Sequence, residues 1–568
     1  MFIATVPNRK SPPAILLRES YRDNGKVKSR TLANLSMLPS AAIAALRLSL
    51  KGEKLAPLNA ESLQIIDSRQ HGPVQAVLAA MKRLKIAELI AARSSPERDL
   101  IVALIAARVI EPHTKLATVR WWHTTTLPSL MGVTACNEDD VYRALDGLLE
   151  RQDTIERKLA ARHLDDDALA LYDLTSSTVE GHHCPLAKRG YNRDGKKGKL
   201  QINYGLLTDA QGRPIAVSVF DGNVGDTKTV MTQVHKLREA FSLNRFVLVG
   251  DRGMITQTQV NELRPLEGVD WITALRPEAI RKLLADGAIQ RDLFDEHNLF
   301  SFIHPNFPGE RLIACRNPAL ARRRAEKRQS MLEATVRELE TVRAMVSRGR
   351  LRTKQAIGVR AGKVVDKFKM AKHMTLDFDD DPFHFAIDQA SVAAEAALDG
   401  LYVIRSSVDE AHMDAAQTVR HYKSLSQVER AFRTFKSLDL QVRPIHHRLD
   451  TRVRAHIFLC MLAYYVQWHL LDAWRPLLFC DEDQQAKTLR DPVAPATRSS
   501  AALDKVHSRT LDDGSPVHSY HTLMKSLATL TRNTCTITTA DEPATFDLFA
   551  TPTAHQQRAF DLLEHITL

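Results

Sequence analysis

The sequence predicts an α/β fold, in which a core of strands and helices follows a β-hairpin and a helical region. Two observations carry this prediction. Residues 168–275 alternate short apolar runs of strand length with turn residues and one helical segment. Residues 40–162 instead repeat apolar residues every three or four positions, as helices with one buried face do. The 568 residues are too many for one hydrophobic core, so we expect several domains.

Six elements define the predicted core. Its first strand, Ala168–Leu174, is apolar except for one carboxylate, and a fully apolar strand, Phe246–Gly250, runs directly into Asp251. The other elements are strands at 200–208, 214–220 and 271–275 and a helix at 228–241. Two strands joined by a polar turn, then a helix and further strands, describe a mixed α/β arrangement.

The regions around this core differ in pattern. Asn24-Gly25 supplies the positive φ angles of a tight turn between two strand-like runs, which predicts a hairpin. We expect the chain to divide into a hairpin unit at 1–38, a helical domain at 39–165, a discontinuous core at 166–275 and 401–475, a mixed insertion at 276–400, and a linker and cap at 476–568. A helical domain ahead of the core suits DNA binding, although no helix-turn-helix signature is visible.

One helix of the insertion, Ala321–Ser347, is strongly basic. Its first part carries Arg322, Arg323, Arg324, Lys327 and Arg328. Two interpretations stay open. The helix lies along a DNA backbone, or it is a solvated surface helix.

Composition narrows the class of protein. The net charge of +11 favours a polyanionic partner, although a basic protein without one has the same composition. The six cysteines form no CxxC pair, which suits a reducing compartment. No signal peptide is visible, and the most apolar stretch, at 457–466, is too short to cross a bilayer. We therefore expect a cytoplasmic, nucleoid-associated protein with no membrane partner.

Two aspartates mark a candidate active site. Asp173 lies inside an apolar strand and Asp251 at the end of another. An isolated charge there is costly unless it is paired or metal-bound, and two adjacent carboxylates attract a divalent cation. Mg²⁺ prefers carboxylate oxygens and substrate phosphate as ligands. Each aspartate taken alone is more typical of a helix cap or a turn.

A third carboxylate, Glu429, lies in a helix predicted at 418–439. Tyr422, Glu429 and Lys436 are spaced by seven, about two helical turns, so they share a face, and Arg433 gathers on the same side. This row is typical of a metal ligand flanked by phosphate contacts. A solvated face with local ion pairs produces the same pattern.

Basic clusters surround these carboxylates. Lys196, Lys197 and Lys199 lie between the first two core strands, together with Lys188, Arg189, Arg193 and Tyr191. A second cluster, at 443–454, follows the Glu429 helix. Such clusters neutralise backbone phosphates, and a solvated charged loop is the alternative.

Three motifs together resemble the insertion-sequence transposases of the "insertion sequence four" superfamily. Tyr-Asp-Leu-Thr-Ser at 172–176 resembles the strand of the first Asp, and Val-Gly-Asp-Arg-Gly at 249–253 resembles the second-Asp motif. The family's helix signature is Tyr, two residues, Arg, three residues, Glu, six residues, Lys. Tyr422, Glu429 and Lys436 match it, whereas Leu425 stands at the Arg position.

The resemblance implies an RNase H-like catalytic core with a DDE active site, spanning roughly 167–474. It implies a transposase that cleaves double-stranded DNA at the ends of its mobile element and joins them to target DNA. Asp173, Asp251 and Glu429 would be the catalytic residues and the ligands of two Mg²⁺ ions, with Mn²⁺ as a substitute. Tyr422, Arg433 and Lys436 would contact DNA, as would Lys196, Lys197 and Lys199. A homodimer on DNA is expected, because two element ends are held together.

Two alternatives share some of these features. Another RNase H-like nuclease, such as a junction resolvase, would keep the metal site but not join strands. A catalytically inactive derivative would keep DNA binding alone, and Leu425 makes this alternative worth testing.

Overall fold

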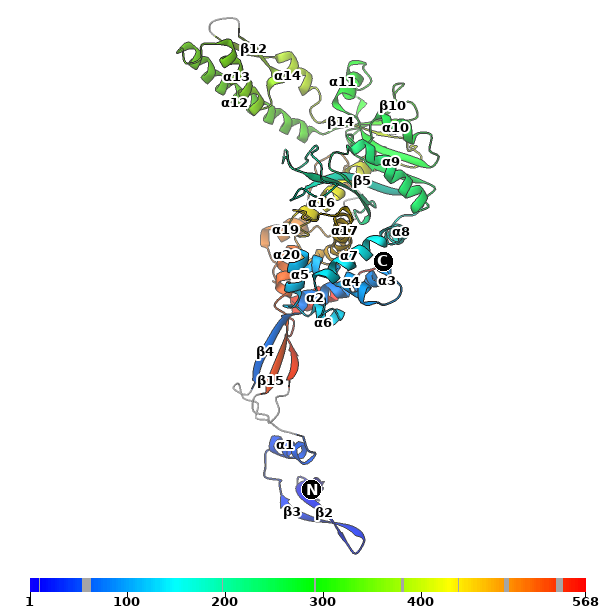
Figure 1. The fold of residues 1–568 in the computed structure, drawn as a ribbon, viewed down its shortest axis with the longest axis vertical. Coiled ribbons are helices and arrows are strands. Elements are labelled where there is room, and N and C mark those ends of the chain that lie inside the picture. The colour runs from blue at the N-terminus through cyan, green and yellow to red at the C-terminus, as the bar shows by residue number, and fades with distance from the viewer. Residues whose placement is uncertain are drawn as a thin grey trace. The chain divides into compact units, whose positions relative to one another are not determined.

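The computed structural model describes all residues except 10, 54–62, 197, 291–292, 379–382, 438, 485–489 and 538–544. The chain forms two compact units. The first unit comprises Met1–Gln70 and Thr529–Thr551, and the second comprises His71–Ala528 and Pro552–Leu568. Figure 1 traces the chain through both units.

The first unit contains two small antiparallel sheets. Strands β1 (Phe2–Val6), β2 (Ala14–Asp23) and β3 (Lys26–Asn34) form the first, and α1 spans Ser40–Leu50. Asn24 and Gly25 have φ angles of 48° and 79° between β2 and β3, so the predicted hairpin is confirmed. In the second sheet, β15 (Thr531–Ile537) lies between β4 (Leu63–Gln70) and β16 (Thr545–Phe549).

This second sheet differs from the sequence-based expectation. We expected helices throughout 39–165 and a linker and cap after 476, but β4 is a strand and its partners come from the C-terminal part. Pairing between segments so far apart leaves no local signal in the sequence. The boundaries of the predicted domains themselves stay a prediction.

Several helices of the second unit pack around one buried helix, α17 (Asp450–Ala473). It contacts α2, α4, α7 and α21 and also strand β7 of the large sheet. Apolar residues lie all round it, so it has no solvent face for most of its length. The helices of this region are α2 (Gly72–Arg83), α3 (Ile86–Ile90), α4 (Pro96–Ile110), α5 (Lys115–Trp122), α6 (Leu127–Met131), α7 (Glu138–Glu150), α8 (Gln152–His163), α19 (Ser500–Ser508), α20 (Tyr520–Leu527) and α21 (Ala554–Leu563).

The core of the second unit is an eight-stranded sheet of order β10-β11-β14-β9-β8-β5-β6-β7. Strand β6 is antiparallel to both of its neighbours, β5 and β7, and β8 and β9 run parallel to β5. These five strands form the RNase H-like core that the sequence predicted. Their bounds are β5 (Ala168–Thr178), β6 (Gln201–Thr208), β7 (Pro214–Asp221), β8 (Phe246–Gly250) and β9 (Val269–Ala274), and the remaining strands are β10 (Leu299–Ile303), β11 (Arg311–Arg316) and β14 (Leu401–Ser406).

The connection between β7 and β8 covers the predicted helix at 228–241. It consists of a 3-10 turn at Asp226–Thr229, α9 (Val230–His235) and a π-helical turn at Lys236–Ala240. A second helix, α10 (Gln257–Leu263), separates β8 from β9.

The insertion contributes to two different cores. Its strands β10 and β11 extend the large sheet, where α11 (Pro277–Ala285) packs. Its basic helix, predicted at 321–347, spans Pro318–Ser347 as α12 and pairs with α13 (Lys354–Lys367), as Figure 1 shows. Leu332, Leu339, Ala361 and Phe383 are buried in a separate cluster between these helices and the pair β12 (Met374–Asp377) and β13 (His384–Ile387), next to α14 (Gln389–Ala396).

Among the described helices, none is long and apolar enough to cross a membrane.

A buried carboxylate joins the helical region to the sheet. Glu156 of α8 is fully buried and accepts hydrogen bonds from Lys236 Nζ at 2.7 Å, Gln152 Nε2 at 2.7 Å and the Val217 backbone N–H at 3.0 Å. Burial raises the pKa of this carboxyl, and the Lys236 ammonium opposes the shift. One side chain therefore fixes α8, β7 and the π-helical turn together.

We predict that Glu156→Ala lowers the free energy of unfolding by about 3–5 kcal/mol, because it leaves Lys236 and a backbone N–H without their acceptor in a buried site. Denaturant titration measures the change. Glu150→Ala, at an exposed position of α7, is the control and should change stability by less than about 0.5 kcal/mol. Equal effects of the two substitutions would contradict the structural role of Glu156.

Candidate active site

Strand pairing makes Asp173 and Asp251 neighbours. Strands β5 and β8 are parallel, and Tyr172 of β5 pairs with Gly250, the last residue of β8. The next residue in each segment is an aspartate. Asp173 is half-buried within the sheet, and Asp251 is exposed just beyond the end of β8. The two aspartates are therefore neighbours on adjacent segments at the carboxyl end of β8, beside the middle of β5.

The surroundings of Asp173 disfavour its negative charge. Burial raises its pKa to about 7, and the carboxylates of Asp251 and Glu429 push it in the same direction. A hydrogen bond of 2.8 Å from the Leu174 backbone N–H and the charge of Arg193 oppose this shift. Burial thus contributes most to the raised pKa, and the two nearby carboxylates add to it.

Glu429 reaches this edge on helix α16. We predicted one helix at 418–439, but the structure has two, α15 (Ala415–Lys423) and α16 (Leu425–Lys436), which are separated at Ser424. The Ser424 hydroxyl donates to the His421 carbonyl at 2.6 Å and so competes with helical hydrogen bonding at this point. Glu429 is exposed, and its charge acts on both Asp173 and Tyr422.

The apolar side of α16 holds the helix against the sheet. Val428, Phe432 and Phe435 are buried, and both phenyl rings lie against Tyr204 of β6, with centroid distances of 5.9 and 6.4 Å. The opposite side of the helix, with Glu429 and Arg433, remains exposed. The amphipathic pattern of the sequence thus orients α16 on β5 and β6.

Tyr422 lies beside the second aspartate. Its hydroxyl donates a hydrogen bond to Asp251 Oδ1 at 3.3 Å. Burial raises the pKa of Tyr422, and Asp251 raises it further, so the hydroxyl stays protonated and remains a donor. The sequence placed Tyr422 among the DNA contacts, whereas in the structure it contacts a candidate catalytic carboxylate.

The donor chemistry suits a hard divalent cation. The charges of Asp251 and Glu429 both act on Asp173, and carboxylate oxygens are what Mg²⁺ and Mn²⁺ prefer. Within the described part of the chain, however, no three His, Cys, Asp or Glu side chains form a group that could hold a metal ion. The carboxylates are therefore neighbours that interact through charge, and their roles as ligands and catalysts stay predictions.

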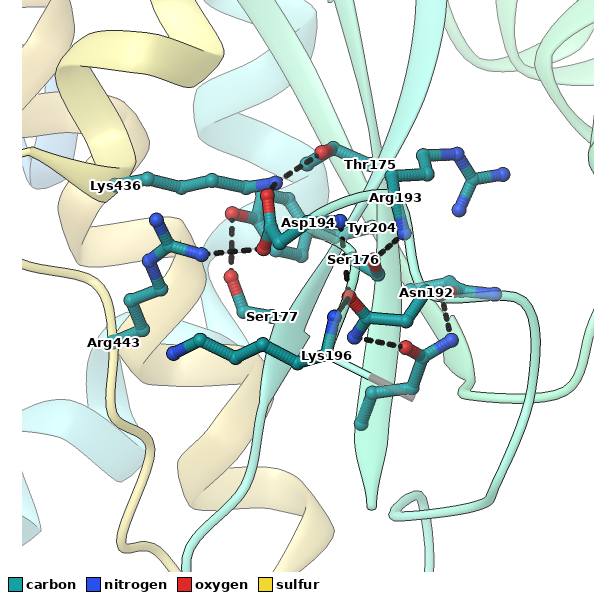
Figure 2. A network of polar contacts seen from close by, with 12 residues as sticks. Thr175, Ser176, Ser177, Asn192, Arg193, Asp194, Lys196, Tyr204, Lys436 and Arg443 are labelled. Carbon is teal, nitrogen blue, oxygen red and sulfur yellow. Dashed lines mark hydrogen bonds and ion pairs between the residues drawn. The ribbon is translucent and has the colours of Figure 1, made fainter. Parts of the chain in front are cut away.

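Lys436 has a different environment from the one expected for a DNA contact. Its ammonium donates to Thr175 Oγ1 of β5 at 2.6 Å and to Asp194 Oδ1 at 3.1 Å, and only 11% of its side chain is exposed. Arg443 forms an ion pair with the other oxygen of Asp194. Figure 2 shows Lys436 and Arg443 converging on Asp194 beside Thr175.

The other predicted DNA contacts lie at the surface or outside the described residues. Lys196 and Lys199 are exposed between β5 and β6, and Arg433 is exposed on α16. Lys197 lies outside the described residues. The cluster at 443–454 is largely used within the protein. Arg452 lies over the Tyr142 ring at 4.3 Å, and Arg454 donates to the Val219 carbonyl at 2.8 Å.

Sequence reasoning missed Asp194 and Asp226. Arg193, which opposes the charge of Asp173, is itself paired with Asp226 at the start of the 3-10 turn. Asp194 stands within a run of basic residues, where a single acid gave no signal. An acidic residue that interrupts a basic run between two core strands is the feature that could have identified it.

Comparison with known proteins covers most of the chain. The family described as "Transposase DDE domain" matches residues 166–466, more than half of the chain, and the "IS1634 family transposase, N-terminal domain" matches residues 3–60. A solved structure of a piggyBac transposase synaptic complex with hairpin DNA covers 82% of this chain and 91% of its own, with 9% identity and a TM-score of 0.35. No curated protein gave a significant match.

We predict that Asp173→Asn stabilises the metal-free protein at neutral pH. The pKa of Asp173 is about 7 in the folded chain, above its ordinary value of 3.8, so the wild type loses stability as pH rises from about 4 to about 7. Asparagine removes this penalty, which is at most about 4 kcal/mol.

Denaturant titrations with a chelator at pH 4 and pH 8 measure the effect. The variant and the wild type should agree at pH 4, and the variant should be more stable at pH 8. A variant that is less stable at pH 8 would show that the Asp173 charge is compensated in the folded protein.

Proposed function

Because the chain belongs to the transposases that carry a DDE domain, and is therefore a DNA transposase, we propose that Asp173, Asp251 and Glu429 are its catalytic carboxylates. The parallel pairing of Tyr172 with Gly250 carries the proposal, since the residue after each of these two is an aspartate. The charge of Glu429 acts on the same Asp173 carboxyl, which adds the third member. The order Asp, Asp, Glu along the chain is the order of the family's motifs.

These residues would hold Mg²⁺, or Mn²⁺ in its place. When bound, two such ions supply positive charge that activates the attacking oxygen and stabilises the leaving oxygen. The pKa of Asp173 is raised first by burial and then by the charges of Asp251 and Glu429. A divalent cation held by these carboxylates would offset both effects, which supports the assignment.

The chain's own residues position the reacting groups. Tyr422 donates to Asp251 and fixes the orientation of that carboxylate. Arg193 carries positive charge beside Asp173. Exposed Lys196 and Lys199, in the same β5–β6 connection as Arg193, and exposed Arg433, on the helix of Glu429, offer phosphate contacts. The attacking hydroxyl loses its proton and forms a bond to phosphorus. The opposite P–O bond breaks, and the leaving oxygen takes up a proton.

The substrate would be double-stranded DNA, cut at the two ends of the mobile element and joined to target DNA. The net charge of +11 and the exposed cations of the β5–β6 connection support a polyanionic substrate. Two ends must be held at once, so a homodimer on DNA is the expected assembly. Leu425 is a half-buried residue at the start of α16, so the phosphate contact of the family's Arg would have to come from elsewhere. Exposed Arg433, on the same side of α16 as Glu429, is a candidate.

We predict that Asp251→Asn and Glu429→Gln each reduce cleavage and strand joining of an end-containing oligonucleotide by at least about a thousand-fold with Mg²⁺. Glu262→Gln, at an exposed position of α10, is the matched control and should retain wild-type rates. Cleavage without joining in the wild type would indicate a nuclease of the resolvase type. A wild type that binds DNA and does not cut it would indicate an inactive derivative.

We also predict a direct effect of metal on stability. Mg²⁺ or Mn²⁺ that binds the folded protein raises its thermal midpoint. At a metal concentration a hundred times the dissociation constant, the free energy of unfolding increases by about 2.7 kcal/mol. Asp251→Asn should abolish most of this rise, and Glu262→Gln should leave it intact. Equal metal stabilisation of the wild type and Asp251→Asn would place the binding site elsewhere.

A further inference from the structure

The chain between β5 and β6 contains a segment rich in cations that lies beside the candidate carboxylates. We call residues 188–199 the basic loop; its described cations are Lys188, Arg189, Arg193, Lys196 and Lys199. Tyr191 stands among them with 82% of its surface exposed. An exposed aromatic ring among cations has the chemistry that stacks on bases next to bound phosphates.

The backbone of the basic loop is held at its base by two side-chain amides. Asn192 Oδ1 accepts from the backbone N–H groups of Asp194 and Lys196, at 2.9 and 3.0 Å. Its amide nitrogen donates to Gln201 Oε1 at 2.7 Å, and Gln201 Nε2 donates to the Tyr191 carbonyl at 2.9 Å. Gln201 is fully buried at the start of β6, so the loop is connected to the sheet.

Asp194 adds a second attachment, and this one comes from a distant part of the chain. Its carboxylate lies between Lys436, the last residue of α16, and Arg443. The side chain of Asp194 is 19% exposed, against 11% for Lys436 and 26% for Arg443. A carboxylate between two cations in a largely desolvated site is costly to separate from either partner.

The ammonium of Lys436 also joins the basic loop to β5, the strand that carries Asp173. Lys436 donates to Thr175, which lies two residues after Asp173 in β5, and the Arg193 backbone N–H donates to the Ser176 hydroxyl at 3.3 Å. Figure 2 shows these contacts meeting in one network. Asp194 therefore connects three segments that each carry part of the site: β5 with Asp173, α16 with Glu429, and the basic loop.

We propose that Asp194 is a positioning residue, which holds the basic loop at the catalytic edge so that Tyr191, Lys196 and Lys199 receive the DNA strand. Lys436 then acts through Asp194 and does not contact a DNA phosphate. The inference rests on the proposed function for its catalytic consequence, but the attachment of the loop is a property of the protein without DNA.

The test compares Asp194→Asn, Lys436→Met and the double variant. Loss of either partner releases the same attachment, so each single variant should slow cleavage at saturating DNA by about ten- to a hundred-fold, as misplacement of a substrate by about 1 Å does. The double variant should be no slower than the slower single variant, because the two residues form one unit. Lys436→Arg, which keeps the charge, should restore part of the rate.

A second measurement needs neither DNA nor activity. Trypsin should cut within the basic loop at least about ten-fold faster in Asp194→Asn and in Lys436→Met than in the wild type, since a released loop opens more often. Asp167→Asn is the matched control, because it removes an aspartate from an exposed pair with Arg245 in the same unit. It should leave both the proteolysis rate and the cleavage rate unchanged.

Three results would overturn the proposal. The first is an unchanged rate of proteolysis in Asp194→Asn. The second is a Lys436→Met variant that weakens DNA binding and lowers its salt dependence by about one unit, as loss of a phosphate contact does, while Asp194→Asn binds normally. The third is a double variant whose loss of cleavage rate equals the combined losses of the two single variants. If the wild type does not cleave DNA but the variants are still proteolysed faster, the proposed function alone is overturned.

Discussion

The parallel pairing of β5 with β8 is the constraint on which the candidate site depends. It sets Tyr172 beside Gly250, and thereby sets the following aspartates at neighbouring positions, although 77 residues separate them along the chain. The sheet is rigid, because its strands are buried by helices that include α16 and α17. Bringing the carboxylates together in a buried place costs free energy, which the rest of the fold offsets. The raised pKa of Asp173 reflects this cost.

The sequence predicted those parts of the fold that have a local signal. Apolar runs located β5, β6, β7, β8 and β9 to within a few residues, since strands buried on both faces are rich in apolar residues. The polar end of β5, Thr175–Thr178, was missed because it lacks this signal. The joining of β10 and β11 to the same sheet was not predictable, because strand composition does not specify which edge a strand extends. The pairing of β4 with β15 was missed for the same reason.

The candidate site, like the fold, could be predicted from the sequence only in part. Helical spacing gave the common face of Tyr422, Glu429 and Lys436, but spacing says nothing about the groups that this face meets. Tyr422 meets Asp251, and Lys436 meets Asp194 and Thr175. Those partners come from loops and strand positions that the three-dimensional fold alone selects, so the residues could be found from the sequence and their contacts could not.

The sheet of β4, β15 and β16 has a consequence for the synthesis of the protein. Its first strand leaves the ribosome when most of the chain has still to be made, and its partners emerge among the last residues. Until then the backbone groups of β4 that pair with β15 have no partner. Folding of the first unit is thus complete only when translation has passed residue 549, so a prematurely terminated product lacks a finished first unit even where its catalytic sheet has formed.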